Sequence, residues 1–291
     1  MPTASNVALV LEGGGTRNAY TAACVDRLLA NDVHFGWVGG VSAGATHTVN
    51  YLSGSRFRNR QSFVEVISGP AAGGMKSLMR GTGYFNAEYI YEQIGLPDAE
   101  LPYDFDTFAA DPTPLRICAM NAATGESVYW DRSDMDSLDS LMKRVRASST
   151  LPGLMPLPVI DGEQYVDGAL GDSGGLITQA AIDDGFDKFF ILRSRPRGFR
   201  RTPPRSQGLL KQILRNYPVV AEAVLTRHER YNASADLIDQ LEQEGKAYVF
   251  YPNRMKIANT ERNFDKLEQA FNYGLAQTLD EWDNWMEFLG L

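Results

Sequence analysis

Ser42 lies at the centre of the pentapeptide Gly40-Val41-Ser42-Ala43-Gly44, which matches the pattern G-x-S-x-G. An apolar segment precedes this pattern and a helical segment follows it, which is the setting of a serine nucleophile on a sharp turn. Gly40 and Gly44 would let the strand and the helix approach each other closely. The alternative is a serine that caps the N-terminus of a helix. We interpret Ser42 as a nucleophile because a strand, a turn and a helix follow one another in the expected order.

A serine nucleophile needs a base, and the chain offers three histidines and one well-placed aspartate. His34 lies in a turn, and His47 is about 140° around the same helix from Ser42. His228 is the candidate for a Ser–Asp–His triad, although it lies in a helical stretch. Asp167, in "YVDGAL", follows a short apolar strand. Burial would raise the pKa of this carboxylate and make it a better base, whereas an exposed turn aspartate would bond only its own backbone.

Gly13, Gly14 and Gly15 follow the first apolar segment and precede Arg17 and Asn18. Backbone N–H groups in such a loop favour an anion, either a bound phosphate or the oxyanion of an ester under attack. A P-loop would end in Gly-Lys-Ser/Thr, which is absent, and a dinucleotide loop would place its third glycine where Asn18 stands. The nucleotide interpretation is therefore the weaker of the two.

The elements that must position these residues follow from hydrophobic periodicity. Residues 6–15 predict a buried strand with a glycine turn, residues 18–32 a helix, and residues 35–52 a second strand, turn and helix. Two such units predict an α/β fold with a mostly parallel sheet, flanked by helices. Both glycine turns then lie at the carboxyl ends of strands, where ligands bind in such sheets.

The rest of the chain predicts further elements of both kinds. We expect a loop or short helices in 66–85, two strands in 114–130, a helix in 136–150, a short strand before Asp167, a helix in 176–185, a strand in 187–194, helical structure in 208–243, a strand in 246–252 and a final helix after Glu261. Segment 66–85 is rich in glycine and methionine. It would either line an acyl-binding site or form a plain surface loop.

Composition limits the partners and the compartment. The chain has 291 residues, 44% apolar and 22% charged, with a net charge of −8, which argues against nucleic-acid binding. Residues 193–215 are basic, and we interpret them either as a solvated surface or as a transient contact with a membrane surface. No apolar run approaches the roughly 20 residues of a membrane span, and no signal peptide is evident. We expect a cytoplasmic protein with Cys24 and Cys118 reduced in the core, and no metal cluster.

Three motifs in order, "EGGGTRN", "GVSAG" and "VDGA", resemble those of the patatin-like phospholipase family, a family of serine acyl hydrolases. The stretch "ASSTLPGLMPLP" is also similar to a family segment, and the tail resembles a bacterial patatin-like subgroup. The resemblance implies a three-layer α/β/α core over residues 6–185, with the sheet continuing to about 195. A mostly helical region, 196–291, would then pack on this core.

Carried over to this chain, the resemblance implies a role for each motif residue. Ser42 would be the nucleophile and Asp167 the base of a dyad. The oxyanion hole would use Gly13, Gly14, Gly15 and Ala43. The supporting motif positions are Arg17, Gly40, Gly44, Gly168, Ala169 and Asn18, the last of which stands where the family usually has glycine.

The expected function is hydrolysis of a lipid or other acyl ester through an acyl-enzyme, without a cofactor or metal. Two alternatives stay open at this point. One is a Ser–Asp–His hydrolase that uses His228, and the other is a catalytically weak family member that binds lipid.

Overall fold

A mixed eight-stranded sheet forms the centre of the molecule, with β1 (Thr3–Leu11) in its interior. The computed structural model describes residues 2–291. The strand order is β5-β6-β3-β2-β1-β7-β8, with β4 paired to β3. The pairs among β1, β2, β3, β7 and β8 are parallel, and those of β4, β5 and β6 are antiparallel. The other strands are β2 (His34–Val41), β3 (Leu115–Asn121), β4 (Ser127–Trp130), β5 (Val159–Ile160), β6 (Glu163–Asp167), β7 (Phe189–Leu192) and β8 (Ala247–Phe250).

Strand β3 determines where two other strands meet. Its residue Ile117 pairs with Gly40 of β2 and with Trp130 of β4, so β2 and β4 lie on opposite edges. Its residue Ala119 pairs with β4 and also with Asp167 of β6. Strands β2 and β6 therefore share one edge of β3 and approach each other end to end.

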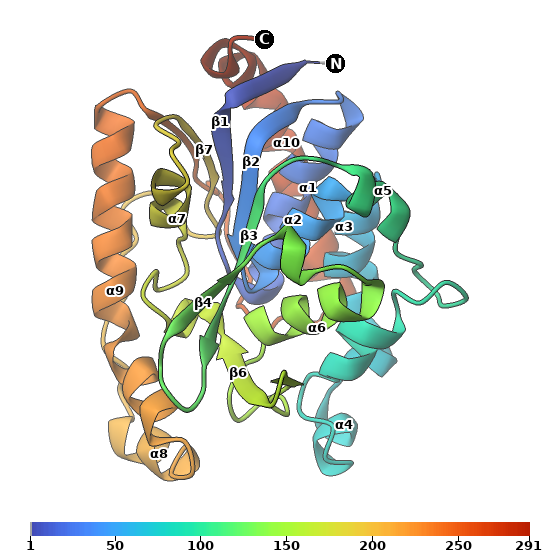
Figure 1. Cartoon of the computed structure of the whole chain (residues 1–291), viewed down its shortest axis with the longest axis vertical. Helices are drawn as coiled ribbons and strands as arrows, with labels where there is room; N and C mark the ends of the chain where they lie inside the picture. The colour runs from blue at the N-terminus through green and yellow to red at the C-terminus, as the bar shows by residue number, and fades with distance from the viewer. Residues whose placement is uncertain (1) are drawn as a thin grey trace.

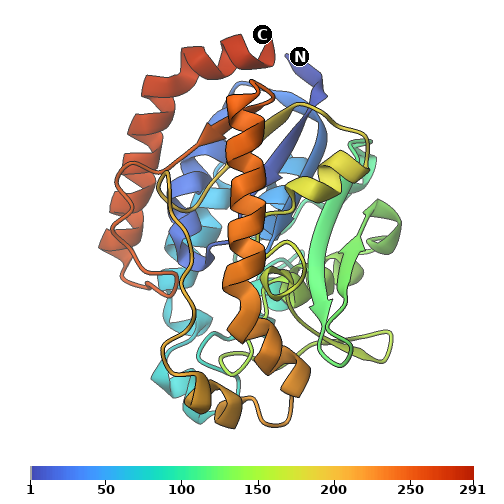
Figure 2. The same ribbon diagram turned by 90° about the vertical axis from the view of Figure 1, so that its left-hand side faces the viewer.

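Helices cover both faces of this sheet, as Figures 1 and 2 show. Alternate residues of β1 face opposite sides, as the pleat of a strand requires. Leu9 and Leu11 pack in a cluster with Tyr20 and Trp285, whereas Val10 packs in a second cluster with residues of the opposite helices. One layer contains α1 (Asn18–Ala30), α2 (Ala43–Leu52), α6 (Leu138–Ser148) and α10 (Phe264–Leu289); the other contains α7 (Thr178–Asp183) and α9 (Pro218–Gln243). The expected fold class, a mostly parallel sheet between helices, is confirmed.

The predicted helical stretch 208–243 is broken into α8 (Gln207–Ile213) and α9. Pro218 stands at the first position of α9, because proline lacks an N–H donor and is tolerated in the first turn but not inside a helix. The expected helical structure in 208–243 is thus present as two helices, and the break allows α8 to project from the lower end of the molecule (Figure 1).

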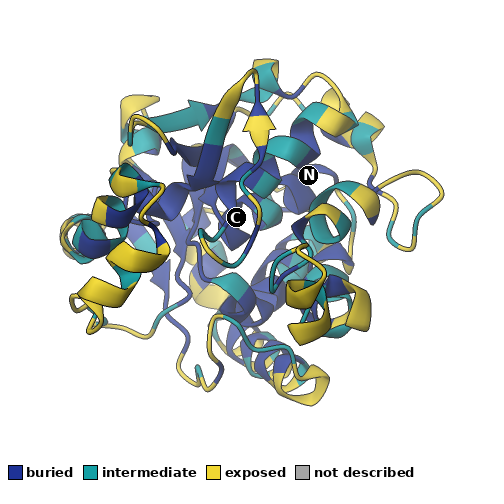
Figure 3. Ribbon diagram, turned by 90° about the horizontal axis from the view of Figure 1, so that it is seen from below, coloured by how far each residue is buried: buried dark blue, intermediate teal, exposed yellow. Residues whose placement is uncertain are grey.

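The region between α2 and β3 consists of short elements. They are α3 (Arg58–Arg60), α4 (Met75–Met79), α5 (Phe105–Ala110) and two π-helical turns, Gln61–Val66 and Glu88–Gln93. From below, Figure 3 shows buried backbone in the centre and exposed residues on the peripheral helices. Both cysteines, Cys24 and Cys118, are buried and free.

Candidate active site

Ser42 occupies a strained turn between β2 and α2. Its φ of 58° and ψ of −128° lie outside the regions that non-glycine residues usually adopt. Added Cβ atoms on Gly40 and Gly44 would come within 2.2 Å of Gly44 O and 2.0 Å of Leu11 O, so both positions need glycine. Ser42 has the N-cap position of α2 but makes no side-chain capping bond. Its hydroxyl is thus turned away from the helix end and is free to pair elsewhere.

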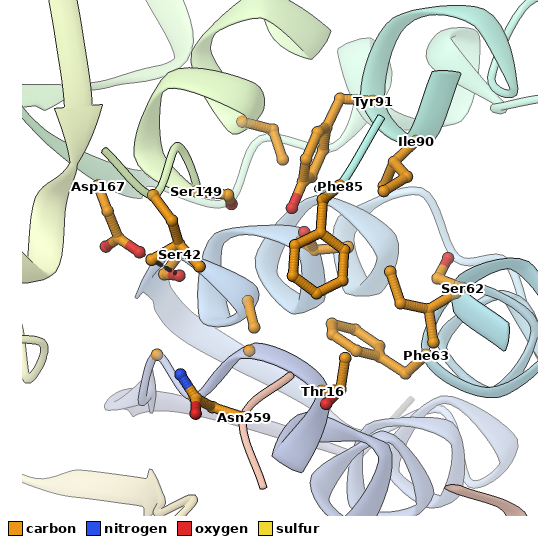
Figure 4. A pocket seen from close by; sticks show the side chains of 18 of the residues that line it. Thr16, Ser42, Ser62, Phe63, Phe85, Ile90, Tyr91, Ser149, Asp167 and Asn259 are labelled. Atoms are coloured by element: carbon orange, nitrogen blue, oxygen red, sulfur yellow. Dashed lines mark hydrogen bonds between the residues drawn. The ribbon is translucent and has the colours of Figure 1, made fainter. Parts of the chain in front are cut away.

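The Ser42 hydroxyl donates to Asp167 Oδ2 at 2.7 Å, and Figure 4 shows the two side chains facing each other. The other carboxylate oxygen, Oδ1, accepts the Ala169 N–H at 2.9 Å. Burial raises the pKa of Asp167, against the lowering effects of Arg227, of these two hydrogen bonds and of Arg201. The structure thus brings together a buried carboxylate of increased basicity and the hydroxyl of a strained serine.

Ser148, at the end of α6, ties the nucleophile turn to the sheet. Its Oγ accepts the Ser42 backbone N–H at 2.9 Å and donates to Cys118 O at 2.6 Å. The side chain is fully buried. Motif reasoning did not identify Ser148, although it lies in the "ASSTLP" stretch that resembles a family segment.

The glycine loop lies directly against the nucleophile turn. An added Cβ on Gly13 would be 2.8 Å from Val41 O, and one on Gly15, whose φ is +58°, would be 2.3 Å from Asn259 O. The Gly13 N–H donates to Gly175 O at 3.3 Å. Within residues 2–291, the N–H groups of Gly14, Gly15 and Ala43 have no hydrogen-bond partner. These three N–H groups are therefore free to donate to an anion beside Ser42.

Asn18 does not need the freedom of a glycine. Its φ of −68° is in the right-handed helical region, whereas Gly15 supplies the left-handed backbone of the loop. The Asn18 side chain donates to Glu12 O at 3.0 Å and so holds the two ends of the loop together. The departure from the family's usual glycine is compatible with the loop conformation.

Glu12, at the end of β1, is the centre of a buried ionic network that sequence reasoning missed. Its carboxylate accepts from Arg193 Nε at 3.0 Å, from the Ser194 N–H at 2.6 Å and from the Tyr231 hydroxyl at 2.7 Å. Burial opposes ionisation, but the Arg193 charge and the hydrogen bonds hold the pKa of Glu12 below its usual value. The network joins the glycine loop to β7 and α9. The sequence around Glu12 contains no pattern that predicts its partners, because they lie about 180 residues or more away along the chain.

None of the three histidines takes part in the Ser42–Asp167 pair. His47 is buried, contacts Thr21 Oγ1 at 3.0 Å and Asn59 Oδ1 at 2.8 Å, and burial lowers its pKa to about 4. His34 pairs with Asp32 near the surface. His228 contacts its own helix through Leu225 O, 3.0 Å from Nδ1. The geometry thus favours a dyad over the triad alternative.

An apolar pocket extends from Ser42 and Asp167 into the helical layer (Figure 4). Its apolar lining includes Val49, Phe63, Val66, Ile67, Phe85, Ile90, Ile94, Val145 and Met155. The two ends of segment 66–85 line this pocket. Met75 and Met79 of α4 are exposed instead, so the middle of the segment fits the surface-loop alternative and its ends fit the alternative of a site lining.

The basic segment 193–215 is partly neutralised by acids that are distant in the sequence. Arg197 pairs with Glu242, and Arg200 pairs with Asp236 and Asp239 of α9. The residues from 205 to 215 retain exposed cationic side chains: Arg205, Lys211 and Arg215.

Within residues 2–291, no group of His, Cys, Asp and Glu side chains has an arrangement suited to a metal ion. None of the helices in this range combines the length and apolar character that a membrane span requires.

The model of the patatin-like phospholipase family matches residues 9–181, more than half of the chain. This chain belongs to the patatin-like phospholipase family. The matched part of this patatin-like chain contains the glycine loop, Ser42 and Asp167. A second family model, described as "Domain of unknown function (DUF6363)", matches residues 217–290.

Two proteins are similar to this patatin-like chain. The "Uncharacterized protein YjjU" of Escherichia coli (strain K12) is 24% identical over 211 residues, which are 68% of this chain and 54% of that protein. The chain thus spans about half the length of this curated relative. The crystal structure of VipD from Legionella pneumophila shares the fold, with a TM-score of 0.52 and 12% identity over 96% of this chain and 67% of VipD.

Proposed function

We propose that this patatin-like protein hydrolyses acyl esters through an acyl-enzyme on Ser42. The observation that carries the proposal is the 2.7 Å contact between Ser42 Oγ and the buried Asp167 carboxylate, on a strained turn beside unpaired N–H donors. A pair of this kind within hydrogen-bond reach is the requirement for an activated nucleophile.

In the acylation step, Asp167 accepts the Ser42 proton while Oγ forms a bond to the acyl carbon. The negative charge that develops on the carbonyl oxygen meets the N–H groups of Gly14, Gly15 and Ala43. One such donor contributes about 3 kcal/mol to lowering the barrier. The bond to the alcohol then breaks, and the proton on Asp167 passes to the leaving oxygen.

In the deacylation step, Asp167 accepts a proton from water, and the resulting hydroxide attacks the acyl carbon. The bond to Oγ breaks, the proton returns to Ser42, and a carboxylic acid is released. Asp167 serves as base and then as acid in both steps.

The apolar pocket supports a fatty acyl substrate. Phe63, Phe85 and Ile90 face its interior (Figure 4), and apolar burial of each additional methylene contributes about 0.8 kcal/mol. We expect kcat/KM to rise with acyl length until the pocket is filled.

We also propose that α4 and α8 contact a lipid surface. Both helices project from the lower end of the molecule (Figure 1) and carry exposed apolar side chains, Met75 and Met79 on α4 and Leu209 and Ile213 on α8. Residues 66–87 and 193–221 contain no acid, although the whole chain has a net charge of −8. Apolar and cationic side chains on one surface suit an anionic membrane interface.

The test of the proposed function is hydrolysis of p-nitrophenyl esters from butyrate to palmitate. The wild type should hydrolyse them with a preference for longer chains, and Ser42→Ala and Asp167→Ala should each lose at least 99% of the rate. His228→Ala is the matched control and should retain activity. Equal rates for Ser42→Ala and the wild type would overturn the proposal. Loss of activity in His228→Ala would instead support a Ser–Asp–His triad.

A further inference from the structure

Arg58, at the start of α3, is a buried cation that has no carboxylate partner. The residue is only 4% exposed. Its Nη1 atom donates to Leu101 O and to Pro102 O, at 2.8 and 2.6 Å, and its Nε atom donates to Asn50 Oδ1 at 3.1 Å. Burial lowers the pKa of Arg58 to about 10, and no carboxylate within residues 2–291 offsets this effect. Arginine is almost never fully buried unless it is paired, so a charge without a counter-ion at this position is unusual.

The apolar pocket reaches Arg58 along one face of α2. Ala43, Thr46 and Asn50 line the pocket, and their spacing of three and four residues places them on the same side of the helix. Asn50 lies eight residues beyond Ser42, which is about 12 Å along a helix. Arg58 lines the same pocket and is hydrogen-bonded to Asn50. The guanidinium is therefore at the end of the pocket that is remote from the nucleophile.

Ser62 belongs to the same remote end of the pocket. It lines the pocket, and its Oγ accepts from Asn50 Nδ2 at 3.4 Å. Figure 4 shows Ser62 and Asp167 at opposite sides of the pocket, with the ring of Phe85 between them in this view. The pocket is thus polar at the dyad, apolar in its middle and polar again at Arg58 and Ser62.

The free polar groups at the remote end are hydrogen-bond donors. Within residues 2–291, Arg58 Nη2 has no hydrogen-bond partner, although Nη1 and Nε are paired. The Ser62 hydroxyl has no acceptor in the same range, and Asn50 Oδ1 is already bonded to Arg58. Among the described residues, Asp167 at the dyad is the one carboxylate that lines the pocket. These donors suit an oxygen atom of a ligand, and the cation favours an oxygen that carries negative charge.

The two kinds of acyl chain end would have opposite effects on this cation. A methyl end that reaches Arg58 displaces water from the guanidinium and offers no hydrogen bond in return, which is unfavourable for a buried donor. A carboxylate end replaces that water by charge-assisted hydrogen bonds and supplies the missing counter-ion. The hydrogen bonds to Asn50, Leu101 and Pro102 already hold the guanidinium in place, so it loses little freedom when it binds a ligand.

We propose that Arg58 and Ser62 form the remote end of the acyl site and select acyl chains with a terminal carboxylate over chains of the same length that end in a methyl group. Asn50 is the positioning residue, because its side chain contacts both Arg58 and Ser62. The substrate class rests on the proposed hydrolase function, whereas binding of a carboxylate at Arg58 does not.

The kinetic test compares two series of p-nitrophenyl esters of matched chain length, from butyrate to laurate. One series consists of simple alkanoates, and the other consists of monoesters of the corresponding dicarboxylic acids. For chains too short to reach Arg58, the wild type should not favour the terminal carboxylate. For the longest chains, it should have at least a tenfold higher kcat/KM for the carboxylate-ended ester. A wild type that favours the alkanoate at every length would overturn the proposal.

Variants of the remote end separate ligand recognition from a purely structural role. Arg58→Gln should reduce the ratio of the two kcat/KM values for the longest chains at least tenfold. Because Arg58→Gln also removes hydrogen bonds to Leu101 O and Pro102 O, Ser62→Ala is the second variant, which keeps those bonds and should reduce the ratio several-fold. Arg60→Gln is the matched control, since Arg60 pairs with Glu65 and Glu268, and it should leave the ratio unchanged. If Arg58 only stabilised the fold, both esters would slow equally, and an unchanged ratio in Arg58→Gln and Ser62→Ala would overturn the proposal.

A binding test does not depend on catalysis. Ser42→Ala is titrated calorimetrically with monomethyl dodecanedioate, and the titration is repeated with Arg58→Gln or Arg201→Gln added. Arg201 lines the pocket at the dyad and is the control for a carboxylate that binds there instead. We expect Arg58→Gln to weaken binding at least tenfold. Undiminished binding in Arg58→Gln, or a loss confined to Arg201→Gln, would overturn the carboxylate site even if the hydrolase proposal holds. Binding that depends on Arg58, in a protein that hydrolyses neither ester series, would overturn the hydrolase proposal alone.

Discussion

The carboxylate of Asp167 lies 2.7 Å from Ser42 Oγ although 125 residues separate them in the sequence. The reason is the shared edge of β3. Val41 pairs with Cys118, and Asp167 pairs with the next residue, Ala119. The last residue of β6 thus stands at the end of β2, where Ser42 begins the turn. Parallel and antiparallel strands on one edge of β3 create the pair.

The pH dependence of activity follows from the raised pKa of Asp167. The base works when ionised, so kcat/KM should fall as pH decreases through this pKa, above the range near 4 that an exposed aspartate shows. A pH–rate profile with a neutral ester measures this acid limb. A limb at or below pH 4 would contradict the assignment of a buried, desolvated base.

The raised pKa of Asp167 also predicts that its ionised side chain lowers the free energy of unfolding at neutral pH. A raised folded-state pKa means that the protonated form is favoured in the fold, so the ionised carboxylate destabilises the protein at neutral pH. Asp167→Asn should therefore raise the free energy of unfolding by about 1 kcal/mol while it abolishes hydrolysis. Urea unfolding at pH 7 is the measurement, and a large loss of stability would show that the charge is needed for folding.

Ser148 should act as a positioning residue. Ser148→Ala leaves the Ser42 N–H and the Cys118 carbonyl without their shared partner, which should cost about 1–3 kcal/mol of stability. We expect a lower kcat with little change in KM, because the nucleophile turn shifts while the acyl pocket remains. Ser149→Ala, at the neighbouring position, is a comparison that leaves both of these hydrogen bonds of Ser148 in place. Equal effects of the two substitutions would argue against the proposed role.

Replacing Asn18 with the family's usual glycine should not improve the enzyme. The backbone of Asn18 is in the right-handed helical region, and its side chain donates to Glu12 O. Asn18→Gly therefore removes this hydrogen bond and increases the conformational entropy of the unfolded chain. The expected loss of stability is about 1–2 kcal/mol, measured by urea unfolding, with no gain in kcat/KM. A clear increase in activity would mean that Asn18 restricts the oxyanion loop.

Much of the site could be predicted because it is encoded in local patterns. "GVSAG", "EGGGTRN" and "VDGA" each contain a turn and the residue that the turn presents, and the strands before them are marked by short apolar runs. The break before Pro218, the first residue of α9, was not among these predictions, because hydrophobic periodicity alone marked 208–243 only as helical.

The remaining features depend on contacts between distant segments. Glu12 meets Tyr231 from α9, 219 residues away, and Arg201 is held by Asn232. Ser148 reaches both Ser42 and Cys118 only because α6 ends beneath the nucleophile turn. No local periodicity contains such pairings, since they arise from the packing of α6 and α9 on the sheet.

Exposed apolar residues on α8 should support binding to an anionic membrane. Leu209→Ser combined with Ile213→Ser should weaken co-sedimentation with phosphatidylglycerol vesicles several-fold, because two apolar side chains no longer enter the interface. Leu279→Ser, an exposed leucine on α10, is the matched control. Undiminished co-sedimentation of the α8 variant would place any lipid contact elsewhere.

The most direct test of the central claim is covalent labelling by a fluorophosphonate, followed by peptide mass mapping. The probe reports an activated serine without requiring knowledge of the substrate. We predict a single adduct on Ser42, absent in Ser42→Ala and formed much more slowly in Asp167→Asn. A folded wild-type protein that remains unlabelled, or an adduct on another serine that persists in Ser42→Ala, would contradict the account.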